Sequence, residues 1–200
     1  MVQVRIAEKA DAKEVLEIYA PYILNYATTF ETEVPALQDF ETRMAHYQVK
    51  YPWLVCLIDQ QVVGYVYASA YKEREAYQWS CECSVYIHNK FQGKGIAKEL
   101  YSVLLPILKM QGFCNVFAGI TIPNEASIKL HEYYGFTPIA IYENVGYKLG
   151  GWKSVGWWRL QLNDYHPEPA PPLAFSKLDH QLFAYNFKTT AEKIQSKIIR

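Results

Sequence analysis

The sequence has no net charge, no long apolar run and few cysteines, and each of these features excludes a class of protein. Twenty lysine and arginine residues balance twenty aspartate and glutamate residues in a chain of 200. Binding to nucleic acid through a general basic field is therefore not expected, although a local anion site is compatible with this balance. No stretch approaches the eighteen or so apolar residues that a membrane-spanning helix needs.

The amino terminus lacks the basic start and apolar run of a secretory signal, and no cysteine pair has the C-x-x-C spacing of a zinc or thioredoxin-like site. We therefore expect a soluble protein in the reducing cytoplasm, without membrane attachment and without a metal. Cys81 and Cys83 are two residues apart in a strand-like run and would point the same way. The sequence leaves open whether they form a disulfide or are two small core or surface residues.

The chain is nevertheless rich in core-forming residues. Half of it is hydrophobic, 20% is charged, and it holds 17 Tyr, 9 Phe and 5 Trp. This composition excludes disorder, and the length suits one domain with an appendage.

Strand and helix patterns alternate along most of the chain, which predicts a mixed α/β domain. Asp11 and Glu14 resemble a capping box at the start of the first helix, and Gly112 is placed to end the helix that follows residue 95. The predicted strands are 2–6, 53–58, 62–70, 80–87, 115–121 and two within 139–162. The predicted helices begin near residues 12, 36, 96 and 126.

The composition changes at Asn163, where four prolines follow within a few residues. We assign residues 1–162 to the main domain, 163–175 to an extended linker and 176–200 to an appendage that packs on the domain or on a partner subunit. Within it, Phe183, Tyr185 and Phe187 alternate like a short strand. Thr189 and Glu192 resemble a capping box for a last helix.

The turn Gln92-Gly93-Lys94-Gly95-Ile96-Ala97 lies between a predicted strand and a predicted helix. Backbone N–H groups of such a turn converge on an anion, and a helix amino terminus adds partial positive charge, so a diphosphate would fit. An ordinary glycine turn is the other interpretation of the turn by itself. The P-loop pattern of ATP and GTP sites is absent, and so is the full G-x-G-x-x-G pattern of dinucleotide sites.

Two motifs in register carry a family resemblance. Val85-Tyr86-Ile87 followed by Gln92-x-x-Gly95-x-Ala97 resembles the acetyl-CoA motif of the GNAT superfamily of N-acetyltransferases. Asn124-x-x-Ser127-x-x-Leu130-His131-x-x-x-Gly135-Phe136 resembles the second motif of that superfamily. The segments 72–86 and 146–152 are similar to the phosphinothricin and methionine sulfoximine acetyltransferases, and the resemblance covers roughly residues 2–162.

The resemblance implies a fold, a cosubstrate and a set of binding residues. The expected fold is α/β, with a mixed, mostly antiparallel central sheet flanked by helices, and the expected cosubstrate is acetyl-CoA. Val85, Tyr86 and Ile87 would align the pantetheine and thioester, and Asn124 would hydrogen-bond the CoA arm. The diphosphate would lie on Gly93, Lys94, Gly95, Ile96 and Ala97.

Two residues are candidates for proton transfer. An α-amino group is mostly protonated near neutral pH, so a base must remove a proton before attack. Glu82 lies where the resembling enzymes carry a glutamate proposed as this base. Without the resemblance, we would interpret Glu82 as a surface or salt-bridged carboxylate. His131 occupies the place where many superfamily members have a tyrosine that protonates the leaving thiolate. His131 either orients substrate, donates a proton or is a structural helix histidine.

Acceptor recognition is expected from a second set of residues. Arg74 can bind a carboxylate or phosphinate bidentately, and Lys72, Tyr77 and Tyr86 could complete the pocket with Phe30 as an apolar wall. The expected activity is N-acetylation of a small amino acid analogue such as phosphinothricin or methionine sulfoximine by a homodimer. A peptide amino terminus, a polyamine, a non-catalytic acyl-CoA-binding module and a nucleotide-binding domain are the alternatives.

Overall fold

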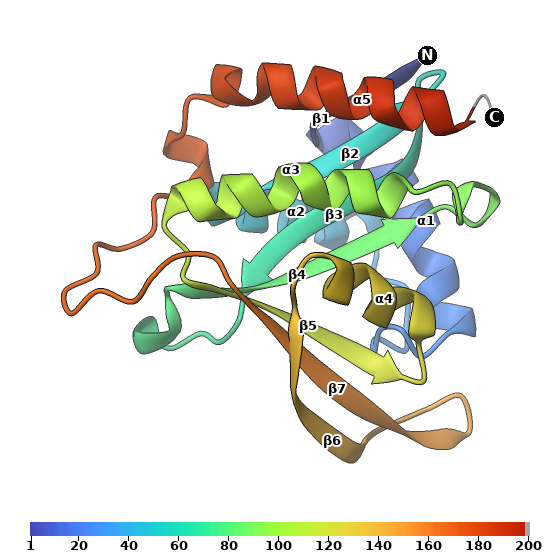
Figure 1. Ribbon diagram of the computed structural model, residues 1–200. Coiled ribbons are helices and arrows are strands. Elements are labelled where there is room, and N and C mark those ends of the chain that lie inside the picture. Colours follow the sequence, from blue (N-terminus) through green and yellow to red (C-terminus); the bar gives the residue numbers. More distant parts are fainter. Residues whose placement is uncertain (199–200) are drawn as a thin grey trace.

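A single seven-stranded sheet organises the computed structural model, which describes residues 1–198 (Figure 1). The strand order is β1-β2-β3-β4-β5-β7-β6, and every neighbouring pair is antiparallel except β4 and β5. The strands are β1 (Val2–Ile6), β2 (Trp53–Ile58), β3 (Gln61–Ala70), β4 (Ser80–Ile87), β5 (Asn115–Ile122), β6 (Thr137–Lys148) and β7 (Gly151–Gln161). The mixed, mostly antiparallel sheet confirms the expected fold class.

Helices cover both faces of this sheet (Figure 1). Side chains of α1 and α2 form one core with the sheet, and side chains of α3, α4 and α5 pack into the core on the other face. The helices are α1 (Ala12–Asn25), α2 (Leu37–Lys50), α3 (Ile96–Gln111), α4 (Glu125–Tyr133) and α5 (Ala184–Ile198). Short 3-10 turns lie at Lys9–Asp11, Glu75–Tyr77, Asn89–Phe91, Phe175–Lys177 and His180–Phe183.

The long central helix α3 is bounded by glycine at both ends. Gly95 precedes it with φ +75° and Gly112 follows it with φ +95°, a left-handed conformation that side chains beyond glycine rarely adopt. The N–H of Gly112 donates to Lys109 and that of Phe113 donates to Leu108. These bonds satisfy the last carbonyls of the helix. The expected end of this helix at Gly112 is confirmed.

The sheet opens along the boundary between β4 and β5. These parallel strands are paired only at Ser80–Asn115, Cys81–Val116 and Glu82–Phe117. Beyond Glu82, β4 stays paired to β3 as far as Ile87, and β5 stays paired to β7 as far as Ile122. The two halves of the sheet therefore separate after Glu82, and backbone on both sides faces the opening.

The predicted capping box at the first helix is wrong by one turn. The reciprocal pair is Glu8 and Asp11, and the Asp11 carboxylate also accepts two hydrogen bonds from Arg5 at 2.6 and 2.8 Å. The Asp11 carboxylate is therefore already hydrogen-bonded to Arg5 and Glu8 and does not cap α1. Glu14 instead accepts a hydrogen bond from the N–H of Val62 at 2.7 Å.

The strand predicted at 183–187 is also wrong, because Phe183 ends a 3-10 turn and the next four residues lie in the helix α5. The aromatic residues at 183, 185 and 187 alternate, but they also belong to a longer pattern with helical spacing. Phe183, Phe187, Ala191, Ile194 and Ile198 recur every three or four residues and all pack on the main core. Thr189 lies inside the helix and donates to the carbonyl of Tyr185 at 2.9 Å, so it is not a cap. Residues 199–200 of the predicted appendage lie outside the described part.

The cysteines and the helix lengths bear on two further expectations. Cys56, Cys81, Cys83 and Cys114 are all buried free thiols, so Cys81 and Cys83 form no disulfide. Among residues 1–198, no helix has the length and apolar character needed to cross a membrane.

The C-terminal segment contributes to the stability of the domain. Phe183 is 1% exposed, whereas Tyr185, two residues later, is 77% exposed. We expect Phe183→Ala to lower the free energy of unfolding by about 3–5 kcal/mol, because it leaves a cavity in the core. Tyr185→Ala should change it by less than about 0.5 kcal/mol. Urea unfolding measures both, and equal stability of the two variants would contradict this packing.

Candidate active site

The opening between β4 and β5 holds a cleft of about 770 Å³. Val85 and Ile87 line it from β4, Thr121 from the end of β5, and Ala97 from the start of α3. Because the two strands are unpaired here, the cleft has exposed backbone on one wall and a helix amino terminus at one end. Such a cleft can hold an extended polar molecule that ends in an anion.

The turn before α3 is held in shape by its glycines and by a tyrosine from α1. Gly93 and Gly95 line the cleft, with φ of +73° and +75°. The Gln92 amide donates to the hydroxyl of Tyr22 at 2.9 Å and to Asn89 at 3.2 Å. Tyr22 in turn donates to the carbonyl of Ile87 at 2.6 Å. These bonds fix the turn relative to the end of β4.

Three of the residues assigned to cosubstrate binding do not line the cleft with their side chains. Ile96 is 1% exposed in the core, and the Lys94 ammonium lies 5.0 Å from the centre of the Phe91 ring. Tyr86 is 7% exposed and packs against the rings of Tyr19 and Tyr22 on the other face of β4. These residues could therefore bind a ligand in the cleft only through their backbone atoms.

Asn124 lines the cleft at the start of α4. Its side-chain oxygen accepts a hydrogen bond from the N–H of Ser127 at 3.1 Å, which caps the helix. The amide oxygen is thereby engaged. A bound molecule would meet the donor end of this amide.

A second groove of about 700 Å³ lies at the start of the β3–β4 connection. Lys72, Arg74 and Tyr77 line it together with His46 and Tyr47 of α2. Lys72, Arg74 and Tyr77 are thus the acceptor-binding candidates that the structure brings together in one groove.

Phe30 lies elsewhere, against Gly146 of β6, where a Cβ atom would have no room beside the ring. Nearby, the Lys148 ammonium donates to the carbonyl of Thr29 at 2.7 Å. The loop that carries Phe30 is thus attached to the β6–β7 hairpin.

Glu82 is the last residue of β4 paired to β5. Its partner on β3 is Ser69, next to Ala70 in the groove, and Val85 in the cleft is three residues further along β4. Burial raises the pKa of Glu82 to about 7, and the positive charge of Lys72 acts in the opposite direction. A carboxyl group with this pKa can accept and release a proton near neutral pH.

His131 is enclosed by other residues. It is 4% exposed; Nδ1 lies 2.7 Å from the carbonyl oxygen of Ser127, and Nε2 lies 2.9 Å from the hydroxyl of Tyr101. Since a carbonyl only accepts, Nδ1 carries the hydrogen, and neutral Nε2 accepts from Tyr101. Burial lowers the pKa of His131, so the ring is neutral near pH 7. His131 is not among the residues that line the cleft.

Tyr22 and Lys98 also line the cleft, and the sequence did not identify either. Tyr22 is one of 17 tyrosines, and its partners are 65 and 70 residues away along the chain. Lys98 lies in the first turn of α3, with its ammonium 3.6 Å from the centre of the Tyr133 ring. A lysine shortly after the predicted phosphate-binding turn was the available signal for Lys98. Within residues 1–198, no group of three or more metal-ligating side chains was found.

Comparison with known proteins connects this geometry to a family. Residues 4–157 match the model of the acetyltransferase (GNAT) domain. A phosphinothricin N-acetyltransferase of Streptomyces viridochromogenes is 38% identical, over 86% of this chain and 91% of the relative. An L-methionine sulfoximine/L-methionine sulfone acetyltransferase of Salmonella typhimurium is 33% identical, over 81% of this chain and 95% of the relative.

A solved structure supports the same relationship. The GNAT phosphinothricin acetyltransferase of Sinorhizobium meliloti, in complex with acetyl-CoA, superposes with a TM-score of 0.81 at 30% identity. The match covers 87% of this chain and 98% of that protein. The chain therefore belongs to the GNAT family of acetyltransferases and is an N-acetyltransferase.

Proposed function

We propose that the protein transfers the acetyl group of acetyl-CoA to the α-amino group of a small amino acid analogue of the phosphinothricin or methionine sulfoximine type, with Glu82 as general base. The observation that carries this proposal is the position of Glu82 on β4, with a pKa near 7. It lies three residues before Val85 of the cleft and is paired to Ser69, which precedes Ala70 of the groove. The curated relatives and the acetyl-CoA complex support the donor and the acceptor class.

The cleft suits acetyl-CoA in three respects. The N–H groups of the turn 93–97 and the positive end of α3 suit a diphosphate. The unpaired edge of β4 at Val85 and Ile87 suits the amide groups of pantetheine, which can extend this edge by hydrogen bonds as a strand would. The Asn124 amide group suits an acceptor atom on the CoA arm.

Conversion of an ammonium group into an amide requires two protons to leave the acceptor nitrogen. Glu82, ionised, takes the first proton from the ammonium group directly or through a water molecule. The amine lone pair then attacks the thioester carbonyl, and the new C–N bond forms. The C–S bond breaks as CoA leaves as thiolate, and the second proton passes from the nitrogen to this thiolate or to water. Because both ring nitrogens of His131 are engaged by Tyr101 and Ser127, we assign it a structural part and no proton donation.

Arg74 and Lys72 favour an anionic acceptor over a polyamine. Both side chains are exposed in the groove and outnumber its one carboxylate, that of Glu73, so the groove favours a carboxylate or phosphinate over a cationic polyamine. A non-catalytic acyl-CoA-binding module would have no use for a carboxyl group with a pKa near 7 three residues from Val85 of the cleft.

We further propose that the protein is a homodimer of the cytoplasm. Its four buried free thiols suit a reducing compartment. Several large apolar side chains on the β6–β7 hairpin are exposed, a pattern that marks interaction surfaces. They are Ile139, Ile141, Val145, Tyr147, Leu149 and Trp152, each about half exposed or more.

Replacing the proposed base should remove turnover and leave the donor bound. We expect Glu82→Gln to lower kcat by about 10²–10⁴-fold, because no group then accepts the ammonium proton. In the wild type, kcat/KM for phosphinothricin should rise with pH through about 7, since only the ionised carboxylate is active. CoA release followed with a thiol reagent measures both. Exposed Glu75→Gln is the matched control, and full activity of Glu82→Gln would refute the proposed base.

Arg74 should affect the affinity for the acceptor and not the affinity for acetyl-CoA. We expect Arg74→Ala to raise KM for phosphinothricin by roughly 10- to 100-fold, because a charged hydrogen-bonding partner is lost. The KM for acetyl-CoA should stay within about twofold. Lys13→Ala removes an exposed charge from α1 and serves as the control for net charge. A phosphinothricin KM unchanged by Arg74→Ala would place the acceptor elsewhere.

The exposed hairpin should lie in a subunit interface. Sedimentation equilibrium should give twice the mass of the chain for the wild type and a single chain mass for Trp152→Glu, since a buried unpaired charge opposes association. Tyr185→Glu, an exposed aromatic position on α5, is the control and should remain dimeric. A monomeric wild type would contradict the proposal.

A further inference from the structure

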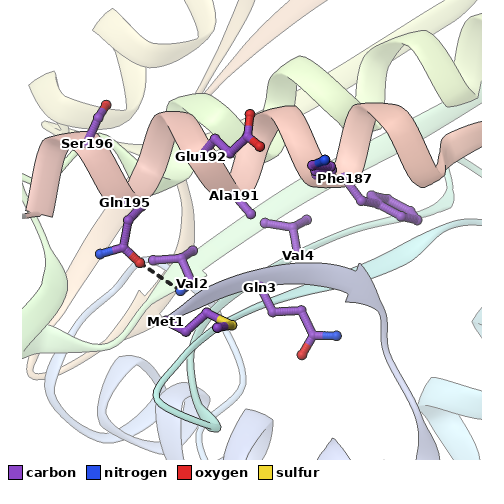
Figure 2. A pocket seen from close by; sticks show the side chains of 10 residues that line it. Met1, Val2, Gln3, Val4, Phe187, Ala191, Glu192, Gln195 and Ser196 are labelled. Carbon is purple, nitrogen blue, oxygen red and sulfur yellow. Dashed lines mark hydrogen bonds between the residues drawn. The ribbon is translucent and has the colours of Figure 1, made fainter.

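The helix α5 lies beyond the segment 4–157 that matches the family model, yet it is attached to the domain. Its Ile194 is fully buried, and the side-chain oxygen of Gln195 accepts a hydrogen bond from the N–H of Val2 at 2.9 Å (Figure 2). The helix crosses the same face of the sheet as α3, and its C-terminal end lies beside the amino-terminal end of α3 (Figure 1). The last turn of α5 therefore reaches the turn that precedes α3.

Lys197 makes this contact. Its ammonium donates to the Glu99 carboxylate at 2.5 Å. Its side chain also lies against Gly95, since a Cβ atom built there would be 3.2 Å from Nζ and 3.3 Å from Cδ of Lys197. Gly95 lines the cleft and Glu99 lies in the first turn of α3, so one side chain from α5 contacts both the turn and a carboxylate of the helix that follows it.

Without a cationic partner, the negative charge of Glu99 would weaken the binding of an anion nearby. Its side chain is only 9% exposed, so solvent screens its negative charge weakly, and it lies one helical turn from the proposed diphosphate position. Two like charges at this separation repel each other. Lys197 cancels this charge, and its ammonium also lies beside Gly95.

We propose that Lys197 is a positioning residue of the cosubstrate site: by neutralising Glu99 and bracing Gly95, it makes the affinity for the diphosphate of acetyl-CoA depend on the C-terminal helix. The proposal rests on the proposed function, in which the turn 93–97 holds that diphosphate. The helix α5 is then a part of the binding site outside the family segment.

Calorimetry with acetyl-CoA tests this proposal. We expect Lys197→Met to weaken acetyl-CoA binding roughly tenfold, because the carboxylate is left unpaired beside the anion. Glu99→Gln should bind at least as tightly as the wild type, and Glu99→Gln with Lys197→Met should return to within about twofold of it. Lys193→Met, which alters an exposed lysine one turn earlier on α5, should have no effect.

A donor without the diphosphate separates this role from a merely structural one. With S-acetylpantetheine, kcat/KM should be the same in all five proteins, because the nucleotide end is absent. An equal loss with both donors, undiminished acetyl-CoA binding by Lys197→Met, or no recovery in the double variant would each overturn the proposal. Should Lys197→Met fail to fold, a weaker binding by Glu99→Gln would overturn it instead. A wild type that binds no acetyl-CoA would show that the proposed function itself has failed.

Discussion

The separation of β4 from β5 is the constraint on which the rest of the structure depends. Parallel strands normally stay paired along their length, but here the pairing stops at Glu82–Phe117 while each strand continues beside its other neighbour. Backbone polar groups need partners. In the proposed complex, acetyl-CoA supplies these partners at the opening, and the amino end of α3 lies at the same opening. One break in the sheet thus gives the cleft an unpaired strand edge and leaves it open to a helix amino terminus.

The position of Glu82 at the same break accounts for its raised pKa. It occupies the last paired position, where burial raises its pKa to about 7 while the strand still fixes its backbone. The basic groove with Lys72 and Arg74 begins one residue beyond its β3 partner. The proposed donor cleft, base and acceptor groove therefore follow one another along the paired strands β3 and β4.

Local patterns in the sequence predicted most of the fold, whereas contacts between distant residues were not predictable. Short apolar runs and the turns between them identified the strands, and the glycines at 93, 95 and 112 identified both ends of α3. The contact of Lys197 with Glu99 joins residues 98 apart, and the enclosure of His131 depends on Tyr101 of another helix. At 183–187, three alternating aromatic residues suggested a strand, and the longer helical period prevailed because it buries Phe187, Ala191 and Ile194 together.

A crystal structure of the acetyl-CoA complex tests the central claim most directly. The account predicts the diphosphate on the N–H groups of residues 93–97, the pantetheine along Val85–Ile87, and the thioester at the Glu82 end of the opening. Acetyl-CoA bound elsewhere, or bound in the cleft with its thioester away from Glu82, would contradict it.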